Sequence, residues 1–143
     1  MTAIAGYFIE DLKPGISASF GKTVTDADIT MFVGVSGDTN PVHIDETFAA
    51  QTPFKTRIAH GMLSAGFIST VLGTKLPGPG SIYMSQTLRF KAPVKIGDTV
   101  TATCTVTEVI PEKRRAVLST VCKVGDTVVI EGEAMIMVPS RGK

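Results

Sequence analysis

The spacing of apolar residues changes between the two halves of the chain. In the first half they recur at helical spacing, as at Ile29, Phe32 and Val33. From Ser81 onward, apolar and polar residues alternate, which is typical of strands with one face toward the core and one toward water. The pattern therefore predicts early helices followed by an antiparallel sheet.

Two helices are expected before residue 51. Thr25, followed by Asp26 and Asp28, predicts the start of the first, because a threonine cap and acidic residues both stabilise a helix N-terminus. This helix is expected to end within residues 34–37. A second, short helix is expected to open at Asp45.

A third helix is predicted to begin at His60-Gly61 and to end at Gly73. Apolar residues fall on nearly every side of it, so it is expected to be buried all round. It is far shorter than the ~20 apolar residues that cross a bilayer. Its length suits a helix that crosses the concave face of a sheet.

Four strands are predicted after the loop at residues 76–80. Gly97-Asp98 opens the second of them, Pro111-Glu112-Lys113 makes a turn, and Gly125-Asp126 signals a tight hairpin before the last strand, Thr127 to Val138. An α+β fold with a curved sheet around a central helix follows. The length of 143 residues predicts a single domain, residues 1–143.

Composition narrows the function classes. Fourteen basic and thirteen acidic side chains leave a net charge of +1, which does not suggest a nucleic-acid-binding protein. Cys104 and Cys122 lack the spacing of a metal site and are interpreted as buried core residues. Neither a signal peptide nor a membrane helix is expected, so the chain is predicted to be cytoplasmic, with no membrane or metal partner.

Asp38 and His43 are the strongest candidates for chemistry. They lie five residues apart, across Gly37 and Pro41, in a stretch that is not expected to form a regular helix. Asx turns at Asp38 and Asn40 let the chain fold back, so the carboxylate and the imidazole can face each other as an acid/base pair. This spacing is common, and on these residues alone a turn cap and a half-buried structural histidine remain an alternative.

Gly61 opens the apolar helix, where unpaired backbone N–H groups and a partial positive charge can bind a carbonyl oxygen that gains negative charge. The alternative is that Gly61 only eases the turn into the helix. For His60, packing or a hydrogen bond at the helix start is favoured over a role in catalysis.

These segments together resemble the MaoC-like hydratases, and in particular the (R)-specific enoyl-CoA hydratases that supply polyhydroxyalkanoate synthesis. The resemblance is carried by Gly37-Asp38-Thr39-Asn40-Pro41-Val42-His43-Ile44-Asp45, by His60-Gly61-Met62, by Gly80-Ser81-Ile82-Tyr83 and by residues 86–98. It extends over roughly residues 12 to 138. It implies a hot-dog fold, in which a five-stranded antiparallel sheet wraps around a central helix, and a homodimer. The fifth strand is expected around Ser17 to Lys22.

The resemblance also implies a site. Asp38 and His43 match the catalytic pair, Gly61 matches the backbone donor to the thioester carbonyl, and Ser69 falls where the family places a serine near the catalytic hydrogen bonds. The implied reaction is addition of water to a trans-2-enoyl-CoA to give a (3R)-hydroxyacyl-CoA. No cofactor is implied, since CoA is part of the acyl-CoA substrate. Two alternatives stay open: a hot-dog acyl-CoA thioesterase and a non-catalytic acyl-CoA-binding module.

Overall fold

Five strands form one antiparallel sheet in the computed structural model, which describes residues 5 to 142. The strands are β1 (Ser17–Thr23), β2 (Ile82–Phe90), β3 (Thr99–Ile110), β4 (Arg115–Val124) and β5 (Thr127–Met137). Their order across the sheet is β1-β3-β4-β5-β2, so β1 and β2 are the edges. The four strands predicted from alternation are confirmed, and β1 is the fifth strand that the family resemblance implied.

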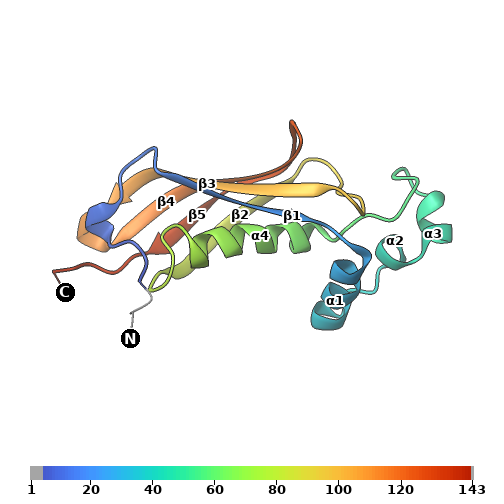
Figure 1. The fold of residues 1–143 in the computed structure, drawn as a ribbon, viewed down its shortest axis with the longest axis horizontal. Helices are drawn as coiled ribbons and strands as arrows, with labels where there is room; N and C mark the ends of the chain where they lie inside the picture. The colour runs from blue at the N-terminus through green and yellow to red at the C-terminus, as the bar shows by residue number, and fades with distance from the viewer. Residues whose placement is uncertain (1–4, 143) are drawn as a thin grey trace.

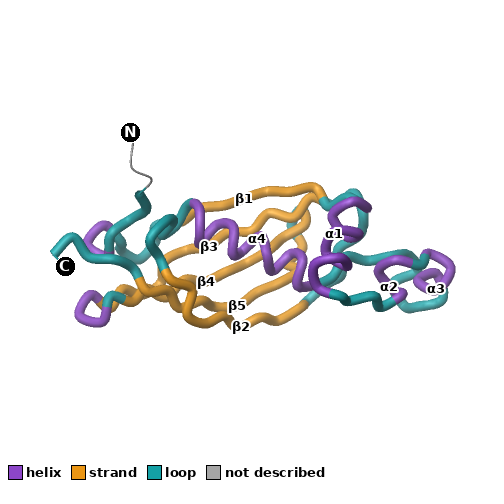
Figure 2. The backbone as a smooth tube through the Cα atoms, turned by 90° about the horizontal axis from the view of Figure 1, so that it is seen from below, coloured by secondary structure: helices purple, strands orange, loops and turns teal. Residues whose placement is uncertain are grey.

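Helix α4 (Gly61–Thr74) lies along the concave side of the sheet, and the other helices lie beyond one end of it (Figure 1). These are α1 (Asp26–Ser36), α2 (Pro41–Ile44) and α3 (Glu46–Ala50), while single 3-10 turns occupy Ile9–Asp11 and Pro111–Lys113. Viewed from the helix side, α4 crosses the strands and its first turn points toward α1 (Figure 2). The predicted α+β architecture with a central helix is confirmed.

The burial of α4 differs from the prediction on one face. Six of its residues are buried, namely Ser64, Ala65, Phe67, Ile68, Val71 and Leu72. On the opposite side Met62 is 55% exposed, and Gly66, Ser69 and Gly73 are exposed as well. The expectation of burial all round is therefore wrong for this stripe, because one sheet can cover only one side of a helix.

Local capping explains the bounds of α1. The Thr25 hydroxyl accepts from the Asp28 N–H at 3.1 Å, and the Asp28 carboxylate accepts from the Thr25 N–H at 2.9 Å. A hydrogen bond from the Lys22 ammonium is the main cause that lowers the pKa of Asp28. Gly37 ends the helix in the left-handed region, at φ 76°, which glycine adopts without strain. The predicted start and end of this helix are confirmed.

The two cysteines behave as core residues. Cys104 and Cys122 are buried, and burial raises the pKa of their thiols to about 12 and about 11. Both thiols are therefore protonated at neutral pH and unsuited to act as nucleophiles.

None of the helices in the described part of the chain has the length and apolar content needed to cross a bilayer.

Gly132 of β5 provides a stability test of the sheet. A Cβ built at this position would overlap the carbonyl oxygen of Thr87 in β2. We therefore expect Gly132→Ala to lower the free energy of unfolding, measured by urea denaturation, by about 1–3 kcal/mol, because β2 must move away from β5. Gly21→Ala in β1 is the matched control, since its Cβ would meet Thr101 Oγ1 at an ordinary 3.6 Å. Equal stability of the two variants would contradict this account.

Candidate active site

The loop after α1 is built from consecutive turns. The Asp38 carboxylate accepts from the Asn40 N–H at 3.2 Å, and the Asn40 side-chain oxygen accepts from the Val42 N–H at 3.1 Å. The predicted Asx turns are therefore present. As predicted, the stretch across Gly37 and Pro41 is not a continuous helix, but Pro41–Ile44 within it form the single turn α2, which the sequence did not indicate. Pro41 is its first residue, where the missing N–H costs nothing and the fixed φ suits a helix.

His43 lies on α2 with its imidazole buried, at 8% exposure. Its Nδ1 is 2.8 Å from the carbonyl oxygen of Ile58. A carbonyl can only accept a hydrogen bond, so Nδ1 carries the proton and Nε2 keeps a free lone pair. The ring is therefore held in the tautomer that can take a proton at Nε2.

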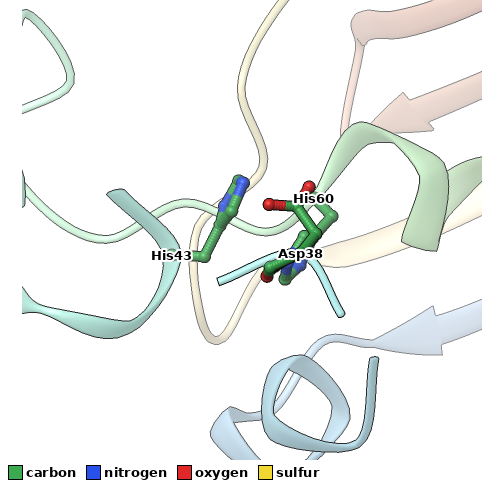
Figure 3. Close-up of side chains that lie close together, drawn as sticks. All are labelled: Asp38, His43 and His60. Atoms are coloured by element: carbon green, nitrogen blue, oxygen red, sulfur yellow. Dashed lines mark hydrogen bonds between the residues drawn. The ribbon is translucent and has the colours of Figure 1, made fainter. Parts of the chain in front are cut away.

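Asp38, His43 and His60 come together from three segments, as Figure 3 shows: the loop after α1, helix α2 and the residue before α4. One nitrogen or carboxylate oxygen of each residue lies within 4.8 Å of those of the other two. The imidazoles of His43 and His60 stack, with ring centroids 3.8 Å apart and planes inclined by 24°. The structure therefore brings the predicted pair together and adds His60 to it.

Gly61 is adjacent to this cluster because it follows His60 in the chain. As the first residue of α4, its N–H has no acceptor within the helix and lies at the positive end of the helix dipole. The ring of Phe90 packs on Gly61 so closely that a Cβ there would lie 2.5 Å from Phe90 Cε1. A side chain at this position would displace Phe90 and obstruct the helix N-terminus.

Ser69 is not brought to the Asp38–His43 pair. It lies two helical turns along α4 from Gly61, about 12 Å at the rise of an α-helix. Its side chain belongs to the open face of α4. There it lines a cavity of about 530 Å³ between α4 and β2, together with Met62, Tyr83 and Gln86.

A second cavity, of about 470 Å³, reaches the start of α4. Its wall includes Phe54, His60, Gly61, Met62 and Phe90. Asp38 and His43 are not part of that wall. Met62 lines both cavities, so they adjoin at the first turn of α4.

Arg57 holds α2 in place, a role that the sequence did not reveal. Its Nε donates to the backbone carbonyl of His43 at 2.7 Å, and its guanidinium pairs with Asp26 at 2.7 Å. Its guanidinium is therefore engaged within the protein. The contacts span 14 and 31 positions in sequence, so no local pattern could have indicated them.

The Asp38–His43–His60 cluster has the residue types of a metal site, but its geometry is unfavourable. An imidazole binds a metal along its in-plane lone pair. Because the two rings stack 3.8 Å apart with an inclination of only 24°, their planes do not meet within the roughly 2.1 Å of a metal–nitrogen bond. The arrangement suits a proton-transfer site better than a metal centre.

Comparison with known proteins agrees with the architecture. The family model described as "MaoC like domain" matches residues 12–131. An (R)-specific enoyl-CoA hydratase of Rhodospirillum rubrum is 62% identical over 136 residues, which cover 95% of this chain and 94% of that protein.

Two solved structures share the hot-dog fold. The unliganded R-hydratase PhaJ1 of Pseudomonas aeruginosa superposes with a TM-score of 0.90 at 44% identity, covering 95% of this chain and 88% of that one. An (R)-hydratase of Aeromonas caviae involved in PHA biosynthesis gives 0.88 at 42% identity, covering 91% and 99%. With a family match over most of its length and relatives of this similarity, the chain belongs to the MaoC-like domain family.

Proposed function

We propose that this chain is an (R)-specific enoyl-CoA hydratase, which adds water to a trans-2-enoyl-CoA to give a (3R)-hydroxyacyl-CoA. The observation that carries the proposal is the cluster next to the N-terminus of α4. In it a ring nitrogen of His43 and a carboxylate oxygen of Asp38 lie within 4.8 Å of each other, and the His43 tautomer leaves the Nε2 lone pair free. These are a base, an acceptor that can orient water, and a donor for the thioester carbonyl. The names of the similar hydratases support the substrate class and the stereochemistry.

Water is activated between Asp38 and His43. The Asp38 carboxylate accepts a hydrogen bond from one O–H of the water, and this proton stays on the oxygen. The other proton is transferred to His43 Nε2, the nitrogen whose lone pair the tautomer leaves free. The oxygen forms the new bond to C3, and the electrons of the C2=C3 double bond move toward the thioester carbonyl. The proton that was transferred to His43 is then delivered to C2, so one water is added across the double bond and nothing is released.

The Gly61 N–H stabilises the enolate oxygen that forms in this step. It is fixed on a helix whose buried face packs against the sheet, so it need not reorganise during the reaction. The helix dipole acts in the same direction. Ser69 is proposed to hydrogen-bond substrate from the cavity between α4 and β2, and no cofactor is required for these steps.

We also propose a homodimer formed through the β2 edge. Ile82, Met84 and Phe90 of this edge strand are 44–56% exposed, and the open face of α4 lies beside it across the 530 Å³ cavity between α4 and β2. An unpaired edge with apolar side chains is a surface that pairs with another strand. A second copy of the chain would cover both the β2 edge and the open face of α4.

The buried unpaired cysteines and a CoA-thioester substrate favour a cytoplasmic location.

The catalytic pair can be tested with near-isosteric variants. Asp38→Asn and His43→Gln are each expected to lower kcat/KM for crotonyl-CoA by at least about 10², because each removes a group that holds or accepts the proton of water. The measurement is the loss of enoyl absorbance, with folding checked by circular dichroism. Asp126→Asn, in the β4–β5 hairpin, is the control and should retain full activity. Near-normal turnover of either site variant would contradict the assignment.

The same assay separates hydration from the thioesterase alternative. A hydratase consumes the double bond and leaves the thioester intact, so a thiol reagent should detect no free CoA. Release of CoA thiol at the rate of substrate loss would instead support hydrolysis. CoA-ester binding with neither reaction would support a non-catalytic module.

The dimer is tested by placing charge on the β2 edge. Sedimentation of the native protein is expected to give twice the chain mass of 15.1 kDa, about 30 kDa. Ile82→Lys combined with Met84→Lys should shift it toward the monomer, since two lysines on each edge would face those of the other copy. Arg89→Lys keeps its charge on the same strand and serves as the control. A monomeric native protein at micromolar concentration would refute the dimer.

A further inference from the structure

We propose that His60 is a positioning residue, which fixes the Asp38–His43 pair relative to the Gly61 N–H. This inference rests on the proposed hydratase function and deepens it. The sequence favoured only packing or a hydrogen bond for this residue. In the structure, His60 contacts the Asp38–His43 pair and is bonded directly to Gly61.

The ring of His60 packs against two other rings. His43 stacks on it at 3.8 Å between centroids, and Phe32 of α1 contacts it at 4.7 Å with a 49° tilt. The ring is 2% exposed, so it has no freedom to turn toward solvent. His60 therefore sets the plane on which the imidazole of His43 rests.

One edge of the ring reaches Asp38. The Nε2 of His60 lies 3.1 Å from the backbone carbonyl oxygen of Asp38, so it donates the hydrogen bond. Asp38 itself is exposed on a loop, and its other hydrogen bonds among residues 5 to 142 are the local turn bonds to Ser36 and Asn40. The bond from His60 is thus the tie that holds the Asp38 backbone to the start of α4.

The position of His60 in the chain adds the third connection. It is bonded directly to Gly61, so the donor to the thioester carbonyl is one peptide unit from the residue that contacts Asp38 and His43. The reacting atoms must be held near 3–3.5 Å apart, and an error of about 1 Å costs on the order of 10² in rate. A single side chain that ties both halves together suits this requirement.

The ring nitrogens of His60 are not explained by a contribution to the stability of the fold. Its Nδ1 is buried and finds no hydrogen-bond partner among the described residues, an arrangement that costs free energy in a folded protein. An apolar ring of similar size would make the same contacts with Phe32 and His43 without that cost. The cost indicates that the Nε2–H donor to Asp38 is the property that matters.

Two variants separate the ring from the donor. His60→Phe keeps a flat ring in contact with Phe32 and His43 and removes the N–H, whereas His60→Gln keeps an N–H donor and removes the ring. We expect His60→Phe to lower kcat for crotonyl-CoA by about 10² while KM changes less than about threefold. His60→Gln should recover part of that loss. The melting temperature of His60→Phe should stay at or above that of the native protein.

Val138→Ala is the matched control for stability. Val138 is fully buried and directly follows β5, whose C-terminal end lies at the end of the sheet away from α1, α2 and α3 (Figure 1). Its truncation should lower the melting temperature and leave kcat unchanged. A native kcat in His60→Phe, or a loss that only follows the fraction unfolded, overturns the proposal. Should His60→Phe not fold, His60→Gln against His60→Leu makes the same comparison.

A double-mutant cycle tests whether His60 acts through Asp38. In an Asp38→Asn background, His60→Phe is expected to lower the residual rate by less than about threefold, because the group that it positions is already lost. A further loss near 10² would show an independent role and would overturn the proposal.

A measurement without substrate keeps this inference separate from the proposed function. The chain has two histidines, so the imidazole nitrogen spectrum of His60→Phe contains His43 alone. If His60 positions the pair, the His43 nitrogen signals should shift or broaden relative to the native protein and recover in His60→Gln only in part. Unchanged His43 signals overturn the positioning role, whereas a native protein that does not hydrate enoyl-CoA refutes the hydratase function instead.

Discussion

The burial of one face of α4 against the concave side of the sheet is the interaction on which the site depends. Ile68, Val71 and Leu72 are at most 2% exposed and join the core formed with β3, β4 and β5. Burying such side chains stabilises a fold by roughly 1.5–3 kcal/mol each. Because this packing fixes the helix, it also fixes where the helix begins. Gly61 therefore begins the helix that has the most buried residues in the described part of the chain. The N-terminus of this helix lies at the end of the sheet where α1, α2 and α3 are found (Figure 1).

The acid/base half of the site is held in a different way. Asp38 and His43 lie beyond the sheet, and their positions depend on hydrogen bonds and on the stacking of His43 against His60. Turn bonds shape the loop locally, while Arg57 ties the His43 carbonyl to Asp26 of α1. The site thus joins a donor positioned by hydrophobic packing to a pair positioned by polar contacts.

The difference between local interactions and contacts that join distant segments explains how much the sequence could predict. Rules that act over a few residues gave the cap at Thr25, the end of α1 at Gly37 and the hairpin at Gly125, and alternation gave four strands. The turn α2 was missed because four residues carry no period. The open face of α4 was missed because an apolar pattern predicts that a helix is buried, but not whether one or two layers of structure pack against it. The contacts of Arg57 and His60 join distant segments, so no spacing indicates them.

The two histidines show why residue type and spacing stop short of mechanism. Both imidazoles are buried, and each donates one N–H to a backbone carbonyl, His43 to Ile58 and His60 to Asp38. These carbonyls assign opposite tautomers, with the proton on Nδ1 in His43 and on Nε2 in His60. The chemistry of each ring is therefore decided by a carbonyl 15 or 22 positions away in the chain. For His43 that choice frees the nitrogen that can act as a base, and for His60 it uses the N–H to hold the aspartate beside it.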